Sequence, residues 1–100
     1  MNQNIRDAVA SGFDSSPELA ARVPPHTLAD LRGYTVDRVP VGDFLTAFLE
    51  NDLMEAACRA DEHNTRCFIA IATFIYNCMP ASSHGSPERV GKWLAGKEGE

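Results

Sequence analysis

The fold of this chain is decided by the stretch Cys67-Phe-Ile-Ala-Ile-Ala-Thr-Phe-Ile-Tyr-Asn-Cys-Met79, which has almost no polar side chain until Tyr76. A helix that is apolar nearly all round is normally buried by its neighbours. At thirteen residues the run is too short to cross a bilayer, which takes roughly twenty. It is also longer than most strands, which run about four to eight residues. The stretch therefore predicts a central buried helix over about residues 65–79.

Cap residues and prolines on both sides of this stretch predict several more short helices. Helix starts are expected at Asn4, Ser16-Pro17, Thr27, Asp43, Asn51-Asp52 and Ser86-Pro87, and helix ends at Gly12, Pro24-Pro25, Pro80 and Gly96. No internal repeat, low-complexity tract or linker divides the chain. We therefore expect an all-α protein, a single small compact bundle of about five to seven short helices around the central helix. This 1–100 domain would consist of N-terminal helices in 1–41, a helical core in 42–96 and a frayed tail at 97–100.

The length and the cysteine content favour a single cytoplasmic domain. One hundred residues make one domain at the small end of the usual range. Residues 1–12 lack a basic start followed by an apolar run, so no secretory leader is expected. The three cysteines are an odd number in apolar helical surroundings, which fits unpaired thiols in a reducing cytoplasm better than a disulfide framework. We expect no contact with a membrane.

The net charge of −5 is concentrated in one fifth of the chain. Residues 43–62 hold six acids and one base, which gives −5. Residues 1–42 hold five acids and four bases (−1), and residues 63–100 hold three acids and four bases (+1). Affinity for nucleic acid comes mainly from clustered Lys and Arg, which this chain lacks. The charge pattern argues against direct nucleic-acid binding and favours a basic partner.

The acidic segment is expected to form one face of two consecutive helices. Carboxylates three or four residues apart on a helix have Cβ atoms about 5–6 Å apart, so a row of them loosely resembles the charges of a phosphate backbone. The candidate partner-binding residues are Asp43, Glu50, Asp52, Glu55, Asp61 and Glu62. The inward stripe of the second helix would be Leu53, Ala56, Ala57 and Ala60. A simpler interpretation stays open, in which the row is a solvated face and Arg59 bridges Glu55 and Glu62.

No residue pattern predicts catalysis, a metal site or a cofactor. His63 and Cys67 are four residues apart and could share a metal ion with Cys58, but structural zinc needs about four ligands. The loop at 81–86 places serines beside His84, yet it lacks the strained elbow that normally presents a serine nucleophile. The sequence contains no phosphate-binding loop, no His-Glu-x-x-His pair and no dinucleotide fingerprint. We expect no catalytic residue, no metal ligand and no cofactor.

From Gly42 onward the sequence resembles a group of short helical proteins encoded by phages and mobile elements. The resembling segments are Gly42-Asp43-Phe44-Leu45, Glu50-Asn51-Asp52-Leu53-x-Glu55-Ala56, Ala60-Asp61-x-x-Asn64, Ile75-Tyr76-Asn77-x-x-Pro80 and Gly85-Ser86-Pro87-Glu88-x-Val90-x-x-Trp93-Leu94. They span a little over half of the chain, and residues 1–41 add nothing to them. Within that group, the size and acidity look most similar to the anti-CRISPR proteins, in particular inhibitors of the type I-F surveillance complex.

The resemblance implies a stoichiometric, non-enzymatic inhibitor in the cytoplasm of a host bacterium. Such a protein would bind subunits of the crRNA-guided type I-F complex and keep out target DNA, as a DNA mimic whose acidic helical surface occupies a basic DNA channel. A net charge of −5 is mild for a DNA mimic, so shape and uncharged surface would contribute equally to the contact.

Two other classes of function stay open. The first is a small phage or bacterial accessory or assembly protein that binds its partner through an exposed apolar patch involving Phe44, Phe48 or Trp93. The second is an enzyme with a pocket lined by His84, Tyr76 and a cysteine.

Overall fold

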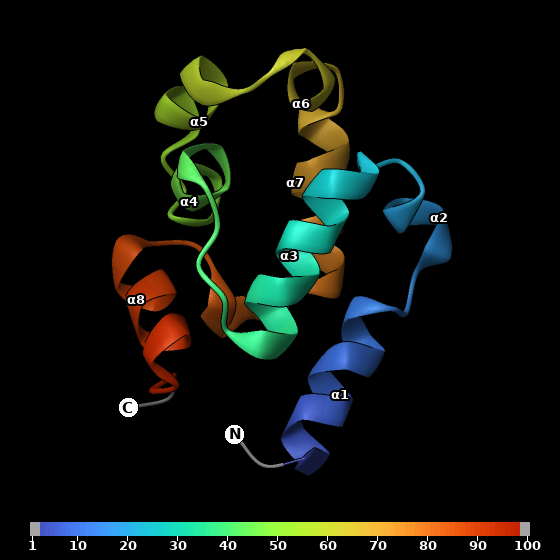
Figure 1. The fold of residues 1–100 in the computed structure, drawn as a ribbon, viewed down its shortest axis with the longest axis vertical. Coiled ribbons are helices and arrows are strands. Elements are labelled where there is room, and N and C mark those ends of the chain that lie inside the picture. The colour runs from blue at the N-terminus through green and yellow to red at the C-terminus, as the bar shows by residue number, and fades with distance from the viewer. Residues whose placement is uncertain (1–2, 99–100) are drawn as a thin grey trace.

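The computed structural model describes residues 3–98 and is all-helical over that range (Figure 1). Its eight α-helices are α1 (Gln3–Phe13), α2 (Pro17–Ala20), α3 (Pro25–Asp37), α4 (Asp43–Leu49), α5 (Leu53–Arg59), α6 (Glu62–Arg66), α7 (Phe68–Cys78) and α8 (Pro87–Ala95). A short 3-10 helix, η1 (Ala81–Ser83), lies between α7 and α8. The predicted all-α class is confirmed. The additional helix is α6, which the start and stop signals did not separate from the central helix.

Helix α3 begins earlier than predicted, because a proline can start a helix as well as end one. Pro25 takes the first position of α3, where its missing N–H is not needed and its fixed φ suits the helix. Thr27, the predicted start, lies inside α3, and its buried hydroxyl donates to the side-chain oxygen of Asn64 at 2.7 Å. Helix α1 likewise continues through Gly12 and ends at Phe13. Helix α1 thus ends one residue beyond the predicted stop at Gly12, and Pro25 begins α3 where the sequence predicts a helix end.

Helices α4 and α5 are joined by a tight turn. Asn51 adopts the left-handed backbone conformation, with φ 64°, which Asn tolerates better than most residues. The amides of Asn51 and Asp52 then donate to the carbonyls of Phe48 and Ala47, which closes the end of α4. The Asp52 side chain accepts from the Glu55 amide at 3.3 Å and caps α5, as predicted. This turn places the acidic ends of the two helices side by side.

The predicted central helix is divided into α6 and α7. Asp61 caps α6, and Cys67 leaves the helical conformation (ψ 13°) before Phe68 begins α7. One face of α7 enters the core through Ile71, Phe74, Ile75 and Cys78. The other face is in solvent, where Ile69 and Tyr76 are 80% and 81% exposed. The prediction that this helix is covered on nearly all sides is wrong for that face.

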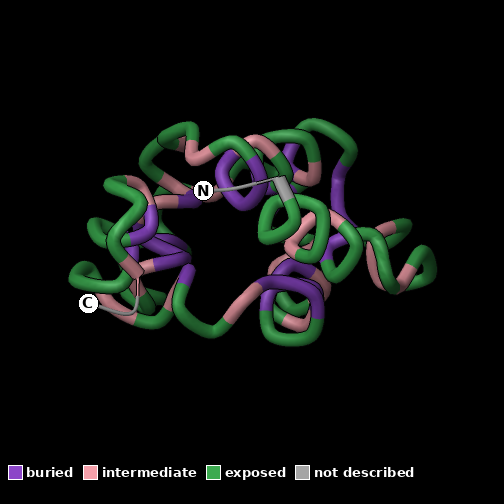
Figure 2. The backbone as a smooth tube through the Cα atoms, turned by 90° about the horizontal axis from the view of Figure 1, so that it is seen from below, coloured by how far each residue is buried: buried purple, intermediate pink, exposed green. Residues whose placement is uncertain are grey.

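A core of aromatic and aliphatic side chains lies between the helices, and Figure 2 shows the buried segments turned toward the middle of the molecule. Its fully covered members include Leu31 and Tyr34 of α3 and Leu49 of α4. The rings of Phe13 and Phe74 meet edge to face with centroids 4.8 Å apart, which joins the end of α1 to α7. The radius of gyration is 12.7 Å, close to the roughly 13 Å expected for a compact chain of this length.

Helix α5 lies at the edge of this core, so its predicted inward stripe is wrong. Ala56 is buried, but Leu53 and Ala57 are exposed and Ala60 is half-buried. At seven residues α5 makes about two turns, and it packs mainly against α4. Ala56 is the side chain of α5 that is buried in this contact, and Leu53 stays at the surface.

Polar contacts fasten the C-terminal segment to α3. The buried Tyr34 hydroxyl donates to the Ser83 carbonyl at 2.6 Å, and Trp93 Nε1 donates to the Tyr34 carbonyl at 3.1 Å. At the end of α3, Arg38 donates to both carboxylate oxygens of Glu98 at 2.6 and 2.8 Å. The Arg38 guanidinium also lies 3.6 Å from the centroid of the Trp93 ring. Glu98 of the predicted frayed tail is thus held by Arg38 in this structure, and residues 99–100 lie outside the described residues.

Within residues 3–98, no helix is both long enough and apolar enough to cross a bilayer. The longest, α3, has 13 residues, whereas a crossing takes about twenty.

Candidate functional site

Four of the six predicted partner-binding acids line one surface hollow on α4 and α5, called here the acidic hollow. Asp43 and Glu50 come from the two ends of α4, and Asp52 and Glu55 come from the start of α5. The hollow has a volume of about 220 Å³, and Arg59 is the one base among its lining residues. Four carboxylates and one guanidinium give a net charge of −3. Asp43 and Glu55 both form ion pairs with Arg59, and Asp43 is the more exposed of the two, with 84% of its side chain accessible.

Arg59 neutralises part of the acidic hollow. Its Nε donates to Glu55 Oε1 at 2.7 Å, and its Nη1 donates to Asp43 Oδ2 at 3.3 Å. The hydrogen bond to Glu55, helped by both nearby carboxylates, raises the pKa of Arg59. The predicted bridge to Glu55 is confirmed. The predicted bridge to Glu62 is wrong, because Ala60 adopts an extended backbone (ψ 136°) and ends α5 before Glu62 is reached.

Asp61 and Glu62 form a separate pair at the start of α6. Asp61 Oδ1 accepts from the Asn64 amide at 2.7 Å, and Asp61 Oδ2 lies 3.7 Å from His26 Nε2. Glu62 pairs with Arg66 one turn later, at 2.6 Å. Both acids are therefore engaged by groups next to them. The six predicted residues form two groups, one on α4 and α5 and one on α6.

A mostly apolar groove lies on the other side of the α4–α5 turn and is called here the α5–α7 groove. It has a volume of about 180 Å³ and is lined by side chains from α4, α5, α7 and the loop before α8, among them Phe48, Asn51, Leu53, Ala72, Tyr76 and His84. Met54, next to Leu53 on α5, is 84% exposed. Ile69 lies two turns before Tyr76 on the exposed face of α7. The groove, with Leu53, Ala72 and Tyr76 in its lining and Ile69 further along the same face of α7, is a second candidate surface.

The apolar patch predicted around Phe44, Phe48 or Trp93 is not where the exposed apolar residues lie. Phe48 and Trp93 are buried, and Phe44 is half-buried against the rings of Phe48 and Phe68. The exposed set is Leu53, Met54, Ile69 and Tyr76, together with Ile5 and Val39 elsewhere. No local signal in the sequence distinguishes Ile69 from the buried Ile71, so pattern reasoning could not find this surface.

His84 and Tyr76 both line the α5–α7 groove. Burial lowers the pKa of His84, the neighbouring Met79 carbonyl opposes that shift, and the Arg89 cation adds to it. The His84 Nε2 atom is buried and has no hydrogen-bond partner within the part of the chain that the structure describes. None of the described cysteines lines this groove, since Cys78 borders the hollow on the other side of α7. The constellation expected for an enzyme is therefore not assembled by the described residues.

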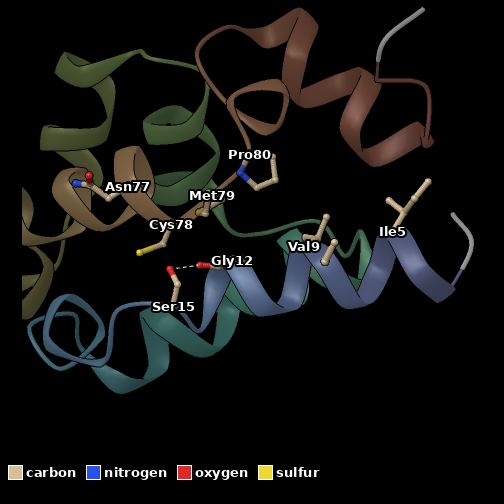
Figure 3. A pocket seen from close by; sticks show the side chains of 9 residues that line it. Ile5, Val9, Gly12, Ser15, Asn77, Cys78, Met79 and Pro80 are labelled. Carbon is tan, nitrogen blue, oxygen red and sulfur yellow. Dashed lines mark hydrogen bonds between the residues drawn. The ribbon is translucent and has the colours of Figure 1, made fainter.

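A third hollow, of about 440 Å³, lies between α1 and the end of α7 (Figure 3). Its walls are apolar side chains from both segments: Ile5, Ala8, Val9, Met79 and Pro80. At one end the Ser15 hydroxyl donates to the Gly12 carbonyl at 2.6 Å. Burial raises the pKa of the Cys78 thiol, so it stays protonated at neutral pH and is a poor nucleophile. The lining of this hollow is mostly apolar, with the polar side chains of Ser15 and Asn77 among it.

The residues considered for a metal ion do not converge. His63 and Cys67 line one hollow with His26 of α3, and Cys58 is exposed on α5. Across residues 3–98, no group of three or more His, Cys, Asp or Glu side chains is placed to hold a metal ion.

The fold and these surfaces define a small all-α protein with two candidate partner-binding surfaces, the acidic hollow and the α5–α7 groove. Comparison of the chain with protein-family models, curated proteins and solved structures finds no match. The function is therefore argued from the two surfaces.

Proposed function

We propose that this protein is a non-enzymatic anti-CRISPR inhibitor that binds the crRNA-guided type I-F surveillance complex and blocks binding of target DNA. The observation that supports this most directly is the acidic hollow, whose lining holds Asp43, Glu50, Asp52 and Glu55 and the single base Arg59. A channel built to hold phosphates presents clustered positive charge, and an exposed patch of net charge −3 complements it. The resemblance of segments between Gly42 and Leu94 to short helical proteins of phages and mobile elements, together with the size, acidity and composition of the chain, favours the same class.

The mechanism is occupancy, and it needs neither a catalytic group nor a cofactor. The carboxylates of the hollow would take the places of DNA phosphates beside lysine and arginine side chains of the complex. Contacts between exposed charges contribute more to association rate and orientation than to affinity, so the surrounding uncharged surface is expected to contribute much of the binding free energy. The protein would act in the cytoplasm of the host bacterium, where the surveillance complex is found.

The first test is a pull-down of the purified protein with a purified type I-F surveillance complex, followed by a target-DNA shift assay. A stable complex that no longer shifts target DNA is the expected result. Absence of association, or association that leaves DNA binding intact, would overturn the proposed function.

Charge reversal tests the proposed surface. The double substitution Asp43→Lys with Glu55→Lys is expected to weaken association at least about tenfold, because it replaces two attractive contacts by two repulsive ones. The matched control is Glu18→Lys with Asp30→Lys, two exposed acids of α2 and α3 that change the net charge by the same amount. Glu62→Lys tests whether the α6 group contributes. Equal effects of the two double variants would show that only net charge matters.

The salt dependence of the affinity gives an independent test of charge mimicry. Exposed charge pairs are screened within about 10 Å at 0.1 M salt, so the affinity for the complex should fall steadily as salt is raised tenfold. An affinity that does not change over that range would contradict charge mimicry.

A second candidate function is a small accessory or assembly protein that binds through apolar surface. The exposure of Ile69 and Tyr76 along one face of α7 favours it, because aligned apolar side chains on one side of a protein often mark an interaction site. Light scattering of the free protein tests its simplest form, in which the chain associates with itself. A monomer at all accessible concentrations would exclude that form.

A further inference from the structure

The α5–α7 groove continues into an exposed apolar row on α7. Ile69, Ala72 and Tyr76 are spaced i, i+3 and i+7, so they lie along one face of the helix, and all three are exposed. Scattered apolar residues on a surface need no explanation, but a row on one helix beside a groove does. Leu53 of α5 lines the groove together with Ala72 and Tyr76. The two helices thus form the walls of a continuous apolar track.

The groove is smaller than the usual site for a small-molecule ligand. Sites for drug-sized molecules usually enclose about 300–1,000 Å³, whereas this groove has about 180 Å³. That space accommodates one large apolar side chain, and the exposed row on α7 extends the contact beyond it. The geometry therefore fits a partner segment that inserts one anchor residue and lies along α7.

A helix fits this track better than a strand does. A β-strand would have to pair with a sheet edge, and the described residues contain no strand. A helix satisfies its own backbone hydrogen bonds, and side chains spaced i and i+3 or i+4 on it would fit between those of Ile69, Ala72 and Tyr76.

The acidic hollow beside the groove predicts the charge of the partner residues that lie next to it. Alternate residues of the α4–α5 turn face the two hollows: Asn51 and Leu53 line the groove, and Glu50 and Asp52 line the acidic hollow. A helix seated in the groove would therefore lie next to a surface of net charge −3. Basic residues on that side of the helix would be attracted and acidic ones repelled. Where His84 lines the groove the charge is opposite, because Arg89 Nη1 donates to the His84 carbonyl at 3.4 Å, so the preference for a basic helix applies to the side next to the acidic hollow.

We propose that the α5–α7 groove binds a basic amphipathic helix of a partner protein, with an apolar anchor against Leu53 and Tyr76 and lysines or arginines facing the acidic hollow. The assignment does not depend on which protein supplies the helix, so it stands whether or not the type I-F complex is the partner.

The test uses two fluorescent synthetic helices of about eighteen residues, or five turns, added to the full chain and followed by fluorescence anisotropy. One has a leucine face and a lysine face, and the other has the same leucine face with glutamates in place of the lysines. The leucine–lysine helix should bind saturably, and the leucine–glutamate helix should bind at least about tenfold more weakly. A scrambled leucine–lysine peptide, which has the same charge without an apolar face, should bind as weakly as the acidic one. Equal binding of all three peptides, or no saturable binding, would overturn the proposal.

Surface variants locate the binding site. Ile69→Ser and Tyr76→Ser should each weaken the leucine–lysine helix about fivefold or more, since both side chains are already in solvent and their loss should not unfold the protein. Val39→Ser is the matched control, because Val39 is apolar and 51% exposed but lies in the segment between α3 and α4. Far-ultraviolet circular dichroism checks that each variant keeps its helices.

Three results would overturn the proposal in distinguishable ways. Loss of binding in Ile5→Ser, with Tyr76→Ser unaffected, would move the site to the hollow between α1 and α7. Equal loss in Val39→Ser would indicate non-specific adhesion. Sedimentation of the wild type as a dimer that Tyr76→Ser dissociates would mean that a second copy of this chain occupies the groove. None of these measurements involves the surveillance complex, so the groove and the inhibitor function can fail separately.

Discussion

The two faces of α7 both carry large apolar side chains, but their environments are opposite. Ile71 and Phe74 are fully buried, whereas Ile69 and Tyr76 are about four-fifths exposed. Phe74 and Tyr76 are two residues apart, or about 200° around the helix axis, so they point in nearly opposite directions. The difference teaches that an apolar sequence predicts a packed helix but not how much of its circumference is packed. In a chain of 100 residues with short helices, surface is large relative to volume, and an uncovered apolar face is available for a partner.

The largest expected effect contrasts the two faces directly. Phe74→Ala removes a buried ring that packs edge to face on Phe13, and it should lower the free energy of unfolding by about 3–5 kcal/mol. Tyr76→Ala removes an aromatic side chain of similar size from the exposed face and should change the same quantity by less than about 0.5 kcal/mol. Urea denaturation of both variants measures the difference. Comparable losses in the two variants would mean that the face with Tyr76 is covered in solution.

The sequence predicts those features of the fold that depend on local patterns. The all-α class follows from helical apolar periodicity, and the caps at Asp52 and Ser86 follow from the residue types that accept backbone amides. The start of α3 was missed because Pro25 is compatible with both the end of one helix and the start of the next. The break at Cys67 was missed because neither a glycine nor a proline marks it.

The sequence predicts which acids make up the candidate site, but it does not predict how they are arranged in space. The excess of acids in residues 43–62 is visible in the sequence, and four of them do share one hollow. Their division into two groups depends on the extended backbone of Ala60, for which the sequence has no distinct signal. The exposure of Tyr76 depends on which helices pack against α7. Such contacts join distant parts of the chain, and periodicity does not encode them.

The second contrast compares a buried tyrosine, Tyr34, with an exposed one, Tyr76. Tyr34→Phe removes the hydroxyl that donates to the Ser83 carbonyl at 2.6 Å and leaves a buried acceptor without that donor. The free energy of unfolding should fall by about 1–3 kcal/mol. Tyr76→Phe removes an exposed hydroxyl and should be nearly neutral. Thermal unfolding followed by near-ultraviolet circular dichroism compares the two. A neutral Tyr34→Phe would show that the contact between α3 and η1 contributes little to stability.

The third contrast compares two ion pairs, one partly buried and one exposed. The hydrogen bonds from Arg38 lower the pKa of Glu98, so this carboxylate favours the folded state when it is ionised. Its contribution is fully present above the unfolded pKa, near 4.3, and is lost as pH falls through the lower folded pKa. Glu98→Gln should cost about 1 kcal/mol at pH 7, and the cost should shrink toward pH 3.

The control for that pair is Glu62→Gln. Glu62 and Arg66 form an i,i+4 pair with both side chains more than 70% exposed, and such pairs contribute little in water. Urea denaturation of both variants at pH 7 and pH 3 separates the contributions. If Glu62→Gln cost as much as Glu98→Gln at pH 7, burial would not be the source of the difference.

The smallest expected effect is on the pH dependence of stability, and it compares His84 with His63. Burial of His84 lowers its pKa, so the folded state binds a proton less readily than the unfolded chain, whose histidine pKa is about 6.5. Stability from the neutral ring is therefore fully present above about pH 6.5 and is lost as pH falls below it. His84→Asn cannot titrate, so its stability relative to wild type should rise between pH 7 and pH 5. His63→Asn, on the exposed surface of α6, is the control for loss of an imidazole as such. A His84→Asn profile parallel to wild type would contradict a lowered pKa of His84 in the folded state.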